Sequence, residues 1–331
     1  MTGNTAHQES APAPAPSAGA FSPLADLSYR GYDGPLHTHH ARWWIVARAG
    51  IRLTCQKPAF WALVGIAAMP YLFSIFILYL TSRFPMPERF PFIDYTVGQK
   101  YAFQFFQAFD LQLFPLLLIA LMVGAGSIAA DNRSNALLIY LSKPLTKGDY
   151  LLGKWMSVFL MVYAVAVVPA LILYLYCLLS YTSDGFLREE PWLVLRFPLA
   201  CALPAGVYAS LLVGISAWSK TPRMAGAIMA GLYFATSIVA GSYWAIRYRS
   251  NITEGIDARH ASLSGVIDGL AQHVYGVTLH ITHLNRREGI MESVALPPPT
   301  FWPMLVAVVG MVVVGLIAAR MRICAVEVVS G

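Results

Sequence analysis

Charged residues are scarce in this sequence: Asp, Glu, Lys and Arg make up 12% of the 331 positions, whereas hydrophobic residues make up 57%. With a mean hydropathy of +0.57, the chain is too apolar for an ordinary soluble domain and falls in the range of multi-pass membrane proteins. The formal net charge of +6 does not indicate nucleic acid, because the basic residues are spread beside apolar runs. Composition therefore predicts one membrane domain, with the lipid bilayer as partner and no nucleic acid.

Cysteine is rare as well. The four cysteines have no paired spacing, so the sequence predicts neither a disulfide framework nor a cysteine metal site. An H-E-x-x-H pattern is missing, and so is any Ser-His-Asp or paired-carboxylate constellation. These absences argue against an enzyme, and we expect no catalytic residue, cofactor or metal ion in this chain.

Six apolar runs are each about long enough to cross a hydrocarbon core of roughly 30 Å as a helix. None contains Asp, Glu, Lys or Arg, and Asp110 lies just outside the second run. A secondary transporter normally holds its coupling ion on ionisable residues at membrane depth, so this pattern argues against ion coupling. The predicted fold class is an all-α integral membrane protein with spans near residues 59–80, 111–130, 155–181, 197–218, 224–246 and 301–319.

The N-terminal region is rich in Ala, Pro, Ser and Gly, a composition that cannot bury enough apolar surface to fold. We therefore predict a disordered cytoplasmic tail over residues 1–38 and a membrane domain over residues 39–331. The tail lacks the basic start and compact apolar core of a signal peptide. Three histidines at its end, His37, His39 and His40, are interpreted as incidental surface residues, because no Cys or carboxylate nearby completes a metal site.

Residues 41–57 sort by helical angle into two faces. Trp43 and Trp44 fall on the apolar side, whereas Arg48 and Arg52 fall on the basic side. This pattern predicts an interfacial amphipathic helix, with its arginines near lipid phosphates and its tryptophans at the depth of the headgroups. The alternative is that the segment is only the irregular start of the first span.

The distribution of Lys and Arg predicts the orientation. The side that carries both termini holds 13 basic and 6 acidic residues, and the opposite side holds 10 basic and 11 acidic residues. Five of those ten lie in the long last loop, which orients a membrane protein weakly. We therefore expect both termini to be cytoplasmic, in a multi-pass protein of the cell (inner or plasma) membrane.

The loop over residues 247–300 is the largest predicted external feature. Its segment 263–284 is expected to form a helix on or in the outer leaflet. His273 and His280 then fall on one helical stripe with His283 nearby, so a metal or proton-sensitive site is one interpretation. Ordinary polar residues of an interfacial helix are the other, and the sequence does not decide whether these histidines bind a metal.

A polar stretch at residues 124–155 separates the second and third apolar runs. Asp131 or Asn132 is expected to cap a short helix with apolar side chains, and Pro144 to end it. A new helix is predicted to begin near Asp149. Residues 148–154 match the first seven positions of the phosphate-binding pattern G-x-x-x-x-G-K, but Trp155 follows where Ser or Thr is needed, and no strand precedes the match. We interpret this segment as a helix that enters the membrane.

The stretch resembles the ABC-2 family of ABC-exporter permeases. In that family a span rich in small residues leads to an acidic residue, a "LLS-P" helix and turn, and then "LGK" at the start of the third span. The family often has Glu followed by a Gly-Thr pair, where this chain has Asp131 and then Asn135 and Ala136. The matching residues are Asp131, Leu137, Leu138, Leu141, Ser142, Pro144, Leu152, Gly153 and Lys154.

The resemblance implies a transmembrane subunit without its own ATPase domain. ATP and Mg²⁺ are then expected in a partner ABC ATPase that docks on residues 131–154, the interfacial helix helps to receive it, and a second permease subunit completes a homo- or heterodimer. Export is the expected direction, and the cargo is not indicated. The alternative is a membrane scaffold or sensor that docks a cytoplasmic partner without transport. The expected ATPase-coupling residues are Asp131, Arg133, Leu137, Leu138, Tyr140, Leu141, Ser142, Pro144, Lys147 and Lys154.

Overall fold

The computed structural model places all of its described residues in one unit, Ala41–Gly331. The described residues are 42–84, 100–134, 146–183, 185–250, 258–285, 290–296 and 299–324. The predicted tail over residues 1–38 and the histidines His37, His39 and His40 lie outside them, and so does most of the predicted short helix before Pro144. Nothing in the structure therefore tests those expectations.

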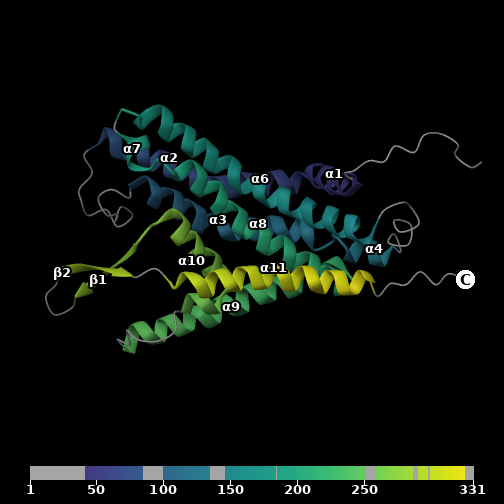
Figure 1. The fold of residues 1–331 in the computed structure, drawn as a ribbon. Coiled ribbons are helices and arrows are strands. Elements are labelled where there is room, and N and C mark those ends of the chain that lie inside the picture. Colours follow the sequence, from purple (N-terminus) through teal and green to yellow (C-terminus); the bar gives the residue numbers. More distant parts are fainter. Residues whose placement is uncertain are drawn as a thin grey trace, which may run out of the picture. The chain divides into compact units, whose positions relative to one another are not determined.

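Six helices in the described residues are long and apolar enough to cross a membrane, which confirms the predicted all-α, six-span class. Figure 1 shows them packed side by side as one bundle, with α1 (Arg42–Cys55) and α4 toward one end and α7 (Phe186–Glu189) toward the other. We call these the Asp131 end and the α10 end. The spans are α2 (Pro58–Arg83), α3 (Lys100–Gly124) with α4 (Ala129–Arg133), α6 (Lys147–Tyr181), α8 (Leu193–Trp218), α9 (Pro222–Ser250) and α11 (Phe301–Cys324).

The second span begins at Lys100, eleven residues before its predicted start. Polar residues among the aromatic ones lowered the hydropathy of this stretch, and the fold buries some of them but leaves Asp110 exposed. Gln104 is 3% exposed, and the fully buried Gln112 donates from Nε2 to the carbonyl of Ala67 at 2.9 Å. Helix α3 therefore includes Asp110, which directly precedes the predicted second run.

Helix α8 lies at the centre of the bundle, where it contacts α3, α6, α9, α10 and α11. Of its most apolar stretch 67% is buried, compared with 17% for α11. Small residues permit this central position, because they let helix backbones approach closely. A Cβ atom added to Gly214 of α8 would lie 2.7 Å from the carbonyl oxygen of Gly315 in α11.

The contact between α8 and α11 supplies a stability prediction. A Cβ atom on Gly315 would lie 2.4 Å from the carbonyl oxygen of Ser210, whereas one on Gly310 of the same helix would meet nothing within 4 Å. Overpacking of this kind typically destabilises by about 1–3 kcal/mol. We expect Gly315→Ala to lower the thermal unfolding midpoint of the detergent-solubilised chain and Gly310→Ala to leave it unchanged. Equal midpoints for the two variants would contradict the close packing.

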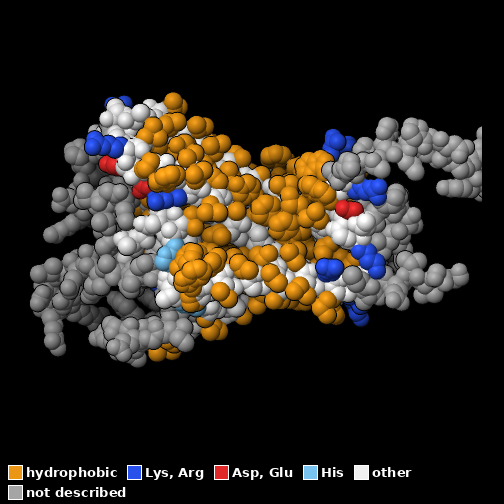
Figure 2. Space-filling model, in the orientation of Figure 1, with side chains coloured by type: hydrophobic (Ala, Val, Ile, Leu, Met, Phe, Trp, Pro, Cys, Tyr) orange, Lys and Arg blue, Asp and Glu red, His pale blue; other side chains and the backbone are white. Residues whose placement is uncertain are grey.

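Outward faces of α2, α9 and α11 carry most of the exposed apolar side chains. Figure 2 shows them as a broad apolar band across the middle of the molecule, with Lys and Arg toward both ends. Such a band is expected where hydrocarbon or another membrane helix covers the surface. The structure is therefore that of an integral membrane protein with several spans.

The region between α9 and α11 corrects the expectation of one helix over residues 263–284. After the 3₁₀ turn η1 (Ala258–Ala261), helix α10 (Leu263–Tyr275) ends at Gly276, whose φ of 70° is left-handed. Strand β1 (Leu279–Asn285) then pairs antiparallel with β2 (Ile290–Leu296). The β-branched residues Ile281 and Thr282 favour a strand here.

The predicted histidine stripe is wrong for the same reason. His273 lies on α10, but His280 and His283 lie on β1, opposite Ala295 and Glu292. Their separation of three positions places them on opposite faces of the strand. His273 is held by a hydrogen bond between its Nε2 and the carbonyl oxygen of Pro299. No helical stripe of three histidines exists, and whether any of them binds a metal stays open.

Candidate functional site at the Asp131 end

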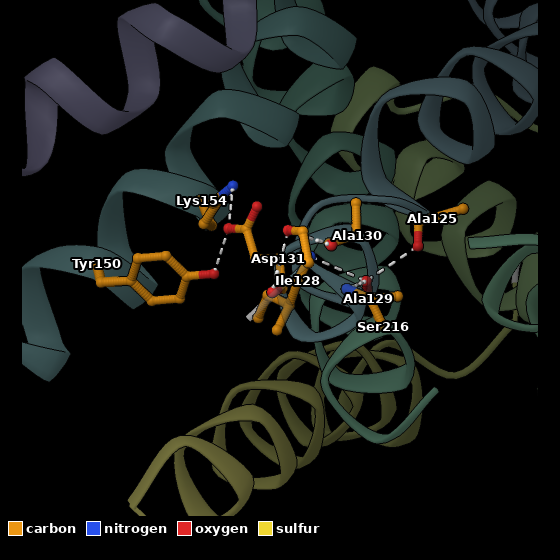
Figure 3. A network of polar contacts seen from close by, with 9 residues as sticks. Ala125, Ile128, Ala129, Ala130, Asp131, Tyr150, Lys154 and Ser216 are labelled. Carbon is orange, nitrogen blue, oxygen red and sulfur yellow. Dashed lines mark hydrogen bonds and ion pairs between the residues drawn. The ribbon is translucent and has the colours of Figure 1, made fainter. Parts of the chain in front are cut away.

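A turn between α3 and α4 positions the first residues of the site. Helix α3 ends at Gly124, where a Cβ atom would lie 3.0 Å from Cβ of Leu212 in α8. The hydroxyl of Ser216 in α8 accepts hydrogen bonds from the backbone N–H groups of Ile128 (3.1 Å) and Ala129 (2.9 Å). It donates to the carbonyl of Ala125 at 2.9 Å, as Figure 3 shows. One buried serine thus satisfies three backbone groups that the broken helix leaves unpaired.

Helix α4 directs Asp131 toward the start of α6. The carboxylate oxygen Oδ2 of Asp131 accepts a hydrogen bond from the hydroxyl of Tyr150 at 2.6 Å and lies 2.7 Å from Nζ of Lys154 (Figure 3). The side chains of Lys154 and Asp131 are 18% and 16% exposed, and Tyr150 is fully buried. Charge-assisted hydrogen bonds of this length are stronger than neutral ones. We call these three residues the Asp131 clamp.

Position and spacing explain how the clamp forms. Tyr150 and Lys154 are one turn apart on α6, so both side chains project from the same face. The helix begins at Lys147, and its N-cap residue Thr146 accepts from the backbone N–H of Asp149 at 3.0 Å. Asp149 therefore lies in the first turn, close to the predicted helix start. Asp131 and Asn132 both lie inside α4, and the short helix before Pro144 that one of them was expected to cap lies mostly outside the described residues, so that expectation stays a prediction.

Lys154 does not lie in a phosphate-binding loop. Residues 148–154 are helical, as interpreted from the sequence, and the ammonium group of Lys154 pairs with Asp131. Gly153 has a packing role instead, because a Cβ atom there would lie 2.6 Å from the carbonyl oxygen of Trp43 in α1. The glycine of the pattern thus lets α1 approach α6 closely.

Helix α1 (Arg42–Cys55) confirms a helix in the predicted interfacial segment and shows what it contacts. Ala47 is buried, and a Cβ atom on Gly50 would lie 2.3 Å from Oγ of Ser157 in α6. Arg48 and Arg52 are exposed, whereas Trp43 is only partly exposed. The helix therefore packs against α6 on one side and presents basic residues on another.

The remaining predicted residues divide into two groups. Arg133 is exposed at the end of α4, and Lys147 is partly exposed in the first turn of α6. Six lie outside the described residues, in the segment 135–145 that connects α4 to α6: Leu137, Leu138, Tyr140, Leu141, Ser142 and Pro144.

Sequence reasoning missed two residues of the site. Tyr150 precedes Lys154 by four positions, and that spacing was a usable signal for a shared partner. Ser216 is 85 positions beyond Asp131 in the sequence and gave no signal, because only the packing of α8 against the turn brings it there.

The Asp131 clamp is a structural link between two helices rather than a catalytic group. It joins the two helix ends from which residues 135–145 emerge, so a displacement of that segment acts on α3–α4 and α6 together. Among the described residues no group of three or more His, Cys, Asp or Glu is placed to hold a metal ion. This arrangement can transmit movement between the connecting segment 135–145 and two spans.

The six apolar helices define a multi-pass membrane protein, and the Asp131 clamp links two of its spans. A family model described as "ABC-2 family transporter protein" matches residues 92–319, about two thirds of the chain. The chain belongs to this family of transport membrane subunits, as its resemblance at residues 131–154 indicated. A search of curated proteins found no significant match.

Proposed function

We propose that the chain is the permease subunit of an ABC exporter, driven by a separate ABC ATPase that docks at the Asp131 end. The observation that carries this proposal is the Asp131 clamp, which ties α4 to α6 with a 2.7 Å ion pair and a 2.6 Å hydrogen bond. The family match to residues 92–319 supports the partnership with an ATPase. ATP and Mg²⁺ then act in the partner chain.

The same proposal sets the orientation. Exposed basic residues gather at the Asp131 end, among them Arg48, Arg52, Arg133 and Arg320. Positively charged residues near short loops favour the cytoplasmic side. With the Asp131 end in the cytoplasm, both termini are cytoplasmic and α10 lies on the outer side of the cell membrane.

A second permease subunit completes the proposed unit. Only 22% of the most apolar stretch of α2 and of α9 is buried within the single chain. These faces leave ample surface for a second copy or a related chain, as well as for lipid. Cargo then moves along the interface between two permeases.

An ABC ATPase gene beside the gene for this chain is the expected genomic finding, and co-expression of the chain with that ATPase tests the function. We expect a stable complex whose ATP hydrolysis is abolished by mutation of the catalytic carboxylate of the ATPase, and no ATP hydrolysis by the permease chain alone. A membrane scaffold or sensor is the competing proposal. Isolation of the chain with a cytoplasmic partner that has no ATPase activity would favour that alternative.

A further inference from the structure

A carboxyl group at the α10 end has an unusual environment. Oδ1 of Asp268 on α10 is buried and has no hydrogen-bond partner among the described residues. The next residue, Gly269, packs so tightly on α11 that a Cβ atom would lie 2.3 Å from Sδ of Met304. Helix α10 therefore cannot easily shift to expose the group. A buried, unpartnered oxygen is far more costly on an ionised carboxylate than on a neutral acid.

A second carboxyl group acts on the first. Asp110 belongs to α3, against which α10 packs, and its negative charge disfavours ionisation of Asp268. Asp110 is exposed in the single chain, whereas Asp268 is mostly buried. When two carboxyl groups interact across a poorly solvated site, the more buried one retains its proton.

A buried amide lies one turn from Asp268. Gln272 is fully buried, and its Oε1 accepts a hydrogen bond from Nη1 of Arg259 at 3.0 Å. Its Nε2 has no hydrogen-bond partner among the described residues. The same helix face thus carries an unpartnered amide donor and an unpartnered carboxyl oxygen. A neutral, protonated carboxyl group suits this face better than a carboxylate, because no donor among the described residues pairs with Oδ1.

We propose that Asp268 is a proton-binding site at the outer side of the permease, with Asp110 as the charge that retains the proton and Gln272 as its neighbouring polar support. The site is separate from the Asp131 clamp, since it lies at the opposite end of the bundle. Its ligand is a proton taken from the outer compartment.

The electrostatics of the site agree with this role. Burial, and then the charge of Asp110, raise the pKa of Asp268 to about 8, while the guanidinium of Arg259 acts in the opposite direction. The ordinary value is 3.8, so the folded protein binds this proton more tightly than the unfolded chain does. The stabilisation is therefore lost as the pH rises toward about 8, and the packing of α10 weakens on the alkaline side.

Two histidines around α10 have hydrogen-bond partners of their own. The two histidines bond to residues just before α11: His273 to Pro299, and His260 to Thr300. α11 carries its charges, Arg320 and Arg322, in its last turns at the opposite end. The titratable or charged neighbours from the elements packed on α10 are Asp110 of α3, Arg196 and Tyr208 of α8, Tyr233 of α9, Arg259 and His260 of η1, and His273 and Tyr275 of α10 itself.

Reaction with dicyclohexylcarbodiimide tests the site, because this apolar reagent modifies protonated carboxyl groups in apolar surroundings. The full chain in lipid nanodiscs, without ATPase or ATP, is treated over a pH range of about 6 to 10. We expect mass spectrometry to find modification at Asp268 that declines with a midpoint near pH 8. Because no ATPase is present, the outcome is independent of the proposed export function.

Two charge variants give opposite expected shifts. Asp110→Asn removes the repulsion, so the midpoint moves to lower pH; Arg259→Gln removes the attraction, so it moves to higher pH. Asp110→Ser replaces the first variant if it fails to fold, and His273→Gln serves as a control that leaves the midpoint in place. Three results would overturn the proposal: no modification of Asp268 at any pH, a midpoint that neither charge variant moves, or protection by sodium ions at constant pH.

Discussion

Asp131→Asn is expected to lower ATP-driven transport by at least about tenfold while leaving ATPase association intact, because charge-assisted hydrogen bonds contribute roughly 1.5–3 kcal/mol. The substitution keeps the size of the side chain but removes the ion pair with Lys154, now 2.7 Å long. Without it, α4 is no longer held to α6 when residues 135–145 are displaced. Transport by the reconstituted complex and co-purification of the ATPase are measured on the same preparation.

A double-mutant cycle separates the clamp from general damage. Lys154→Met removes the same ion pair from the other side, so the combined variant should lose little more than either single one. Arg133→Gln is the matched control, because Arg133 is an exposed cation on the same short helix. Surface charges of this kind contribute only about 0–1 kcal/mol. Additive losses from Asp131→Asn and Lys154→Met would show that the two residues act independently.

Apolar run length was enough to predict the six spans, since a hydrocarbon core requires long helices with every backbone group paired internally. It failed at the start of α3, where Gln104 and Asp110 interrupt the pattern. Neighbouring helices bury Gln104. The hydropathy of the local sequence does not reveal such burial. The predicted run therefore left out the first turns of α3, which include Asp110 of the proposed proton site.

Local sequence also predicted the segment after α9 poorly. Ser262 caps α10 by accepting from the backbone N–H of Gly265 at 2.9 Å, and Gly276 ends it. Both residues are recognisable signals for the ends of a helix, and the prediction of one helix over residues 263–284 did not use them. Only four residues separate β1 from β2, which pair as a hairpin, so the prediction of one helix over residues 263–284 misplaced His280 and His283.

The candidate site was predicted in part. The family motif predicted its two charged residues, Asp131 and Lys154, and in the structure they form an ion pair. The roles of Tyr150 and Ser216 were found only in the structure. The contact of Tyr150 with Asp131 depends on the angle between α4 and α6, and that of Ser216 depends on the packing of α8 beside the turn. The apolar residues of the connecting segment stay a prediction from sequence, since 135–145 lies outside the described residues.

The second large effect is expected in that segment. Leu138 and Tyr140 are not needed for a connecting loop in water, so we infer that they insert into a groove on the ATPase. Burial of each large side chain contributes roughly 1.5–3 kcal/mol, and loss of both should weaken assembly by about a hundredfold or more. The six spans should still insert, because their own apolar length determines insertion.

Co-purification of the ABC ATPase with the Leu138→Ser/Tyr140→Ser double variant is the most direct measurement of this coupling. The chain should be produced at normal levels, remain monodisperse and lose both the ATPase and ATP-driven transport, whereas Arg133→Glu should retain the ATPase. Poor production or aggregation of the double variant without selective loss of the partner would mean that the segment packs only on its own membrane domain. A double variant that keeps full ATPase association and transport would contradict docking at the Asp131 end.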